Sequence, residues 1–195
     1  ATEGSCATTW TLGAGLTATN VTVSGKDTLD LATYGVSGPA AVTNAGTLRI
    51  GGTQTILGTV TNETGSTVEY YGSGATSLAA GQAYVNLTVV EGAWATTGAL
   101  TVTGNLTITS GSLDLAGKDL TVSTALTNAG TLRLRGDEAT VTLPAGTIGG
   151  TVVYYGKGAN ASITGLAAGY AYTSLSLATE GSCATTWTLG AGLTA

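Results

Sequence analysis

The residues of this chain that could perform acid–base chemistry are acidic side chains, which occur in pairs near expected chain corners. Two carboxylates can act as general acid and base on a glycosidic bond. The chain has no histidine, which excludes a Ser-His-Asp triad and the usual zinc shell. The plainer interpretation is that these acids cap corners and keep the surface soluble, which predicts no enzyme and no cofactor. The pairs are Asp27/Asp30, Asp114/Asp119 and Asp137/Glu138.

Three other residue types could carry chemistry. The two cysteines, Cys6 and Cys183, occupy one position of a duplicated segment. They are either small buried residues or a covalent link between neighbouring molecules. The glycine–aspartate nonapeptide of calcium-binding β-rolls is missing, so no metal site is predicted. In a host with the glycosylation machinery, the asparagines in N-x-S/T sequons are candidate sugar acceptors. They are Asn20, Asn62, Asn86, Asn105 and Asn160.

Aromatic residues cluster in the pairs Tyr70-Tyr71 and Tyr154-Tyr155. An exposed row of aromatic rings could bind the faces of sugars. The favoured interpretation is that one tyrosine of each pair points inward and stacks on aromatic residues of neighbouring coils. Asn44 and Asn128 precede expected corners, where they could stack on asparagines of adjacent coils or adopt a turn conformation.

The elements that must position these residues are β-strands. Short runs of Val, Leu and Thr are interrupted by Gly, Asn and Ser, which favours an all-β fold. Charged residues make up only 9% of the chain and the net charge is −5, which argues against a nucleic-acid partner. No apolar run reaches the roughly 20 residues that a membrane helix needs, so we expect no membrane insertion. The acidic, Thr-rich, Lys-poor composition favours an extracellular or cell-surface location.

The chain repeats itself at two levels. Residues 178–195 are identical to residues 1–18, so the repeat unit spans 1–177 and the next unit begins at 178. Within the unit, TNAGTLRI at 43–50 returns as TNAGTLRL at 127–134. The unit therefore consists of two diverged half-repeats of about 88 residues, which is the kind of periodicity that signals a repeat architecture.

A finer period of about 20 residues, with alternating apolar residues inside each strand, predicts one continuous parallel β-solenoid over residues 1–195. The conspicuous apolar pairs divide the unit into eight steps, which predicts eight coils and a rise of roughly 38 Å. The two longest steps, from Val21 to Leu48 and from Leu106 to Leu132, are expected to bulge a loop from one face. The alternative is two tandem immunoglobulin-like β-sandwiches, because a half-repeat has the length of such a domain. The anchors are Val21, Leu48, Val68, Leu87, Leu106, Leu132, Val152 and Leu175.

The run GNLTITSGSLDLAGKDLTVSTALTNAGTLRLRG at 104–136 resembles the right-handed parallel β-helix repeats of large bacterial surface proteins. Filamentous haemagglutinin-like adhesins and autotransporter passenger domains are the families it is similar to. The resemblance covers most of the chain and implies an extracellular stalk or fibre, in which near-identical tandem units are known.

The sequence therefore predicts a structural repeat protein that forms an extracellular fibre, sheath or adhesin stalk. Its expected partner is itself, head to tail or as further tandem units of one long chain, because both ends lie within the repeat and carry no polar cap. Lateral bundling and contact with surface glycans are further expectations. The alternative from another class is a carbohydrate-binding or carbohydrate-active β-helix protein, and a designed repeat protein is a third interpretation.

Overall fold

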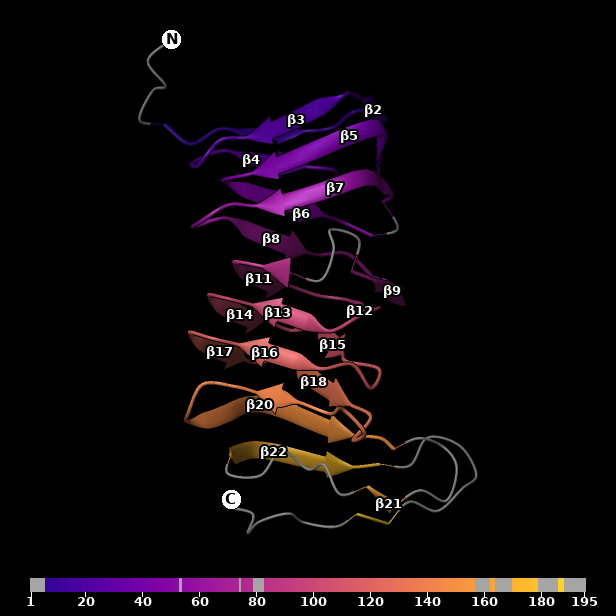
Figure 1. Ribbon diagram of the computed structural model, residues 1–195, viewed down its shortest axis with the longest axis vertical. Helices are drawn as coiled ribbons and strands as arrows, with labels where there is room; N and C mark the ends of the chain where they lie inside the picture. The colour runs from indigo at the N-terminus through magenta and orange to yellow at the C-terminus, as the bar shows by residue number, and fades with distance from the viewer. Residues whose placement is uncertain are drawn as a thin grey trace.

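We describe a computed structural model of the chain over residues 6–52, 54–73, 75–78, 83–156, 162–163, 170–178 and 186–187. Every regular element in these residues is a β-strand. The strands stack along one long axis, from β2 and β3 near the N-terminal end to β20, β22 and β21 near the C-terminal end (Figure 1).

Two sheets make up most of the stack. The seven-stranded sheet contains β1 (Thr9–Thr11), β4 (Thr28–Asp30), β6 (Thr47–Ile50), β8 (Thr67–Tyr70), β11 (Asn86–Val89), β14 (Asn105–Ile108) and β17 (Ala125–Asn128). The six-stranded sheet contains β9 (Ala75–Ser77), β12 (Ala93–Ala95), β15 (Ser112–Asp114), β18 (Thr131–Leu134), β20 (Thr147–Tyr154) and β22 (Ala171–Leu177).

Shorter sheets close the coil. One contains β10 (Ala83–Tyr84), β13 (Leu100–Val102), β16 (Leu120–Val122) and β19 (Val141–Thr142). Another covers the N-terminal coils with β2 (Leu16–Thr17), β3 (Asn20–Val23), β5 (Val36–Asn44) and β7 (Ile56–Asn62). A two-stranded sheet near the C-terminal end pairs β21 (Ser162–Ile163) with β23 (Thr186–Trp187).

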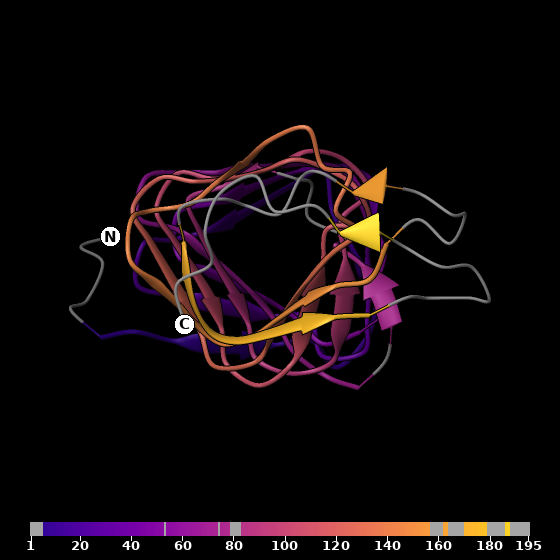
Figure 2. The same ribbon diagram turned by 90° about the horizontal axis from the view of Figure 1, so that it is seen from below.

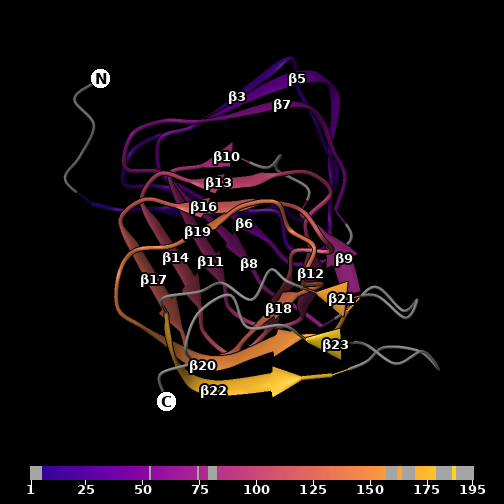
Figure 3. The same cartoon turned by 60° about the horizontal axis from the view of Figure 1, so that its bottom comes forward.

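The path of the chain is a three-faced coil. From β8 to β19 each turn visits the seven-stranded sheet, then the six-stranded sheet, then the β10–β19 sheet (Figure 3). All of the strand pairs within the described residues are parallel, and neighbours lie about one turn apart, as in Leu87 with Leu106 and Leu106 with Leu126. The predicted β-solenoid, with turns of about 20 residues, is confirmed. The sandwich alternative is wrong, because its sheets would be antiparallel.

Apolar side chains at every second position of the strands fill the inside of the coil. Strands β6, β8, β11 and β18 all bury every second residue, which is the period that a strand imposes on its two faces. Leu48, Val68, Leu87 and Leu106 stack on successive turns of one face and are fully buried. Viewed along the long axis, the strands superpose into a closed outline around this core (Figure 2).

The two long steps in the sequence are not loops bulged from one face. Leu106 stacks on Leu126 after one ordinary turn of the seven-stranded sheet, and Leu132 follows on the next face, in the six-stranded sheet. Likewise, Val21 lies in β3 and Leu48 lies in β6, which belong to different sheets. The expectation was wrong because each long step covers a full turn and one further face.

A column of glycines lies at the corner after the strands of the seven-stranded sheet. A Cβ at Gly72 would collide with the carbonyl oxygen of Gly51, and one at Gly92 would collide with that of Gly72. The same relation links Gly111 to Gly92, Gly130 to Gly111, and Gly150 to Gly130. This corner is therefore too narrow for any side chain, and Gly72 and Gly92 also have positive φ angles of 94° and 84°.

Candidate functional site

The aspartates singled out for acid–base chemistry hold corners of the coil. Asp30 ends β4, and its Oδ1 accepts a hydrogen bond of 2.8 Å from the amide of Ala32. Asp114 ends β15 and accepts an equal bond of 2.8 Å from the amide of Ala116. Both alanines have positive φ angles, 50° and 51°, which cost energy in residues with a Cβ. Each aspartate thus stabilises a strained corner.

The other predicted acids also bind backbone amides. Asp27 accepts a hydrogen bond of 3.0 Å from the amide of Thr8, and Asp119 accepts one of 2.9 Å from Thr140. Each of these bonds joins successive coils, as it spans 19 or 21 residues.

Asp137 and Glu138 fix one local turn. Glu138 accepts hydrogen bonds of 2.7 Å from the amides of both Arg135 and Gly136, and Asp137 pairs with the Arg135 guanidinium at 2.7 Å. The bond to Asp137 raises the pKa of Arg135 above its ordinary value. The adjacent acids therefore bind different groups of the same turn, Glu138 two backbone amides and Asp137 the Arg135 guanidinium.

A charged cluster lies on the outer surface of the seven-stranded sheet, and we call Asp30, Arg49, Glu69 and Tyr71 the first cluster. Strand register places Asp30, Arg49 and Glu69 on three successive turns. Arg49 contacts Asp30 at 2.8 Å and Glu69 at 2.6 Å. The guanidinium also lies 4.4 Å from the centre of the Tyr71 ring, a distance typical of cation–π contacts.

The pKa values of Arg49 and Tyr71 are both raised in the first cluster. The hydrogen bond to Glu69 is the main cause that raises the pKa of Arg49. The Tyr71 hydroxyl donates to Asp30. Burial, followed by this bond, raises the pKa of Tyr71 to about 12. Tyr71 therefore remains a neutral hydrogen-bond donor throughout the physiological pH range.

A second cluster, formed by Asp114, Arg133 and Tyr155, lies on the six-stranded sheet. Arg133 contacts Asp114 at 3.4 Å and lies 4.9 Å from the centre of the Tyr155 ring. The Tyr155 hydroxyl donates to Asp114 at 2.9 Å. These three residues follow Asp30, Arg49 and Tyr71 at one constant interval in the sequence, so the half-repeat has duplicated the cluster.

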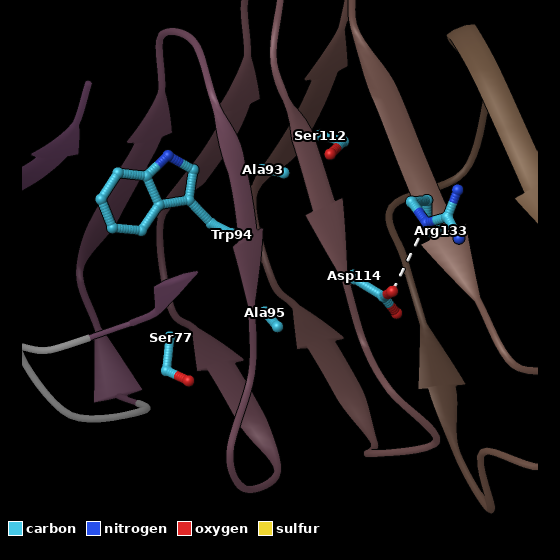
Figure 4. Close-up of a pocket in the computed structure, with 7 residues that line it drawn as sticks. All are labelled: Ser77, Ala93, Trp94, Ala95, Ser112, Asp114 and Arg133. Carbon is cyan, nitrogen blue, oxygen red and sulfur yellow. Dashed lines mark hydrogen bonds and ion pairs between the residues drawn. The ribbon is translucent and has the colours of Figure 1, made fainter. Parts of the chain in front are cut away.

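A groove opens beside the second cluster on the outer surface of β9, β12, β15 and β18 (Figure 4). Its volume is about 280 Å³. Small side chains line most of it, and the Asp114–Arg133 ion pair stands on one side. Sugar hydroxyls could hydrogen-bond to such a pair, but the carboxylate of Asp114 already accepts bonds from three partners. The small lining residues are Ser77, Ala93, Ala95 and Ser112.

The aromatic residues beneath this groove belong to the core. Trp94 is 1% exposed, and its ring centre lies 4.6 Å from that of Tyr70. The hydroxyls of Tyr70 and Tyr84 lie 3.0 Å apart, and burial raises the pKa of Tyr84. Inward stacking across coils is thus confirmed for Tyr70. In the second pair Tyr154 is fully buried, whereas Tyr155 packs against Arg133 in the outer cluster.

Asparagines form part of the stack between coils. The buried Asn44 donates a hydrogen bond of 3.1 Å to the side-chain oxygen of Asn62 on the next turn, which confirms the asparagine stacking for this residue. Asn128 instead donates to the carbonyl of Gly149 at 2.8 Å.

The candidate glycosylation residues differ in exposure. Asn20 and Asn105 are exposed. The side-chain nitrogens of Asn62 and Asn86, to which a sugar would be attached, each donate a hydrogen bond of 3.0 Å to a backbone carbonyl, of Ala83 and Ser66 respectively. Asn160 lies outside the described residues.

Cys6 is exposed and its thiol is free, so it is not the buried small residue that one interpretation predicted. Cys183 lies outside the described residues. The described part of the chain contains no group of three potential metal ligands among His, Cys, Asp and Glu. It also contains no helix that is long and apolar enough to cross a membrane.

Reasoning from the sequence missed both arginine clusters and the groove. The signal was present, because DLA, TLR and YYG all recur in the second half-repeat at the same interval. Comparison with known proteins adds no assignment: no protein-family model, curated protein or solved structure matches the chain.

Proposed function

We propose that this chain is a structural repeat protein, a rod segment that continues end to end into an extracellular fibre, sheath or adhesin stalk. One observation carries the proposal. Strand β23, Thr186–Trp187, has the same sequence as Thr9–Trp10 of β1, and it pairs in parallel with β21. The same sequence therefore occurs both as the first strand of a unit and as a strand added to the preceding coils.

The chemistry of the described surface supports a mechanical role. Hydrogen bonds between parallel strands run along the long axis through the stack. The acids that were candidates for catalysis are bound to corner amides or to arginines. Such bonds stiffen corners, which is what a rod requires.

The location outside the cell is supported by composition and by the resemblance of residues 104–136 to bacterial surface repeats. Surface proteolysis of intact cells and immunogold labelling test it. Labelling confined to the cell interior would refute this part of the proposal.

Electron microscopy of the native material tests the fibre itself. The expected result is filaments whose diffraction shows a spacing near 4.8 Å along the axis, the distance between stacked strands. Separate particles of the length of a single unit, at every protein concentration tested, would contradict a fibre.

A second candidate function, glycan binding, is favoured by the groove beside Asp114 and Arg133. Its test is a titration with oligosaccharides followed by NMR, using Ala95→Trp to fill the groove and the exposed Tyr34→Trp as the matched control. Binding that is lost only in Ala95→Trp supports this candidate, and equal spectra with and without sugar exclude it for the sugars used.

A further inference from the structure

Corresponding strands of the two half-repeats lie on different faces of the coil. Strands β4, β6 and β8 lie in the seven-stranded sheet, whereas their counterparts in the second half-repeat, β15, β18 and the end of β20, lie in the six-stranded sheet. Four turns bring the chain from β4 through β6, β8 and β11 to β14, and one more face brings it to β15. A half-repeat therefore comprises four turns and one third of a turn.

The complete unit shifts twice as far. From β1, six turns lead to β17 along the seven-stranded sheet. Asn128 at the end of β17 donates to Gly149 in β20, and Thr147 of β20 pairs with Ala171 of β22, which adds two turns. The chain then crosses the six-stranded sheet in β22 and reaches β23. The copied strand thus lies two faces beyond the face on which the original strand β1 lies, so the unit is longer than the eight coils expected from its anchors.

The edge at β1 presents an apolar surface. Among the described residues β1 pairs with β4 alone, and Trp10 is 64% exposed. A hollow of about 150 Å³ lies beside it, with Leu16, Val21 and Leu29 among its lining residues. On the equivalent turn of the second half-repeat, Trp94 is 1% exposed and has the additional strand β9 paired to its own strand. The β1 edge therefore lacks the coil that covers its counterpart.

The structure also shows which strand pairs with the copy of the β1 sequence. Residues Thr186 and Trp187, identical to Thr9 and Trp10, pair with Ser162 and Ile163 of β21. A second copy of the unit that places its own β21 on this edge would reproduce that register.

From these observations we infer that the β1 edge binds the β21 end of a second copy of this unit, with Ser162 opposite Thr9 and Ile163 opposite Trp10, and that each unit is consequently displaced from its neighbour by two of the three faces, which equals a rotation of one third of a turn in the opposite direction. The inference rests on the proposed fibre function and specifies its geometry. One unit spans eight turns and two thirds of a turn, which corresponds to a rise of about 42 Å along the axis. Three units make up 26 turns, return to the starting face and span about 125 Å. The same groove and cluster face three directions in succession along the fibre.

The rotation is tested on an array of several units of residues 1–177, joined as residue 178 follows residue 177 here, and imaged by cryo-electron microscopy. We expect a straight rod in which successive units are related by a rise of about 42 Å and a rotation of one third of a turn. A continuous rod with no rotation between units would overturn the inference while leaving the fibre function intact. Units that form separate particles would overturn both.

In the full chain β23 already pairs with β21, so the docking edge is tested on residues 1–177, which leave β21 open, by sedimentation velocity over a range of concentrations. This segment should form end-to-end oligomers, and its Trp10→Arg variant should remain monomeric because it places a charge on the apolar edge. The matched control is Tyr34→Arg, at another exposed aromatic residue, which should associate like the unchanged segment. Circular dichroism establishes that both variants are folded. A segment 1–177 that stays monomeric, or equal association of all three, would overturn the assigned edge.

Discussion

The two arginine clusters are copies of one arrangement that have diverged in strength. In the first cluster Arg49 is held between two carboxylates, Asp30 at 2.8 Å and Glu69 at 2.6 Å. In the second, Arg133 has Asp114 at 3.4 Å, and Val153 stands where Glu69 stands in the first. The corner bond and the tyrosine bond persist in both.

The surroundings of the clusters have also changed. The small groove residues Ala93, Ala95 and Ser112 occupy the positions at which the first half-repeat has Thr9, Thr11 and Thr28. Smaller side chains leave the space that forms the groove. The corner aspartate and the tyrosine are therefore the structural part that both clusters share. The residue at the Glu69 position and the residues that line the groove are free to vary.

The largest loss of stability should come from a substitution in the core, compared at equivalent positions of the two half-repeats. Trp94→Ala removes a buried ring that contacts Tyr70, so we expect a loss of about 3–5 kcal/mol in the free energy of unfolding. Trp10→Ala, on the equivalent turn but 64% exposed, should cost less than about 1 kcal/mol. Urea denaturation measures both. Equal losses would contradict the assigned difference in burial.

Removing the corner aspartates comes next. Asp30→Ala takes acceptors from Ala32, Arg49 and Tyr71, and the Asp30 side chain is 10% exposed, against 25% for Asp114. We expect about 2–3 kcal/mol of destabilisation at Asp30 and about 1–2 kcal/mol for Asp114→Ala. Thermal and urea unfolding provide the measurement. A larger loss at Asp114 would reverse the ranking of the clusters.

Alkaline pH should weaken the first cluster. The pKa of Tyr71 is raised to about 12 in the folded chain, from an ordinary value of 10.0. The unfolded chain therefore loses this proton first, and the stabilisation is complete below pH 10 and is lost as pH rises from about 10 towards 12. Tyr71→Phe should flatten this part of the stability–pH curve, whereas the exposed Tyr34→Phe should leave its slope unchanged. An unchanged slope in Tyr71→Phe would refute the assignment.

The smallest effect should come from restoring the missing charge. Val153→Glu places a carboxylate one turn from Arg133 in the register of Glu69 and Arg49. A partly exposed pair of this kind contributes up to about 1 kcal/mol and weakens with salt. Unfolding at low and high ionic strength measures the gain, with Glu69→Val as the reciprocal variant. A gain that does not depend on salt would indicate packing instead of charge.

The sequence was sufficient to predict the solenoid, its turn length and the inward alternation, because these depend on spacing along the chain. The corner role of Asp30 and Asp114 also followed from their position beside expected turns. Spacing counts residues and does not say which face they reach, so the steps from Val21 to Leu48 and from Leu106 to Leu132 were misread as bulged loops.

The clusters could not be predicted for a related reason. Asp30 and Tyr71 lie 41 residues apart in the sequence, and their contact exists only because the strand register stacks two turns. The exposure of Cys6 likewise depends on its surroundings in three dimensions, which its residue type does not determine.

The regular interval between paired strands has a consequence for how the chain folds. Each new strand pairs with a strand that ended about one turn earlier in the sequence, as β14 does with β11 and β17 does with β14. The loop closed at each step stays one turn long however long the chain becomes, so its entropic cost does not grow. An all-β protein of this kind can therefore grow from one end, coil upon coil, because each new coil needs only the coil before it as a template.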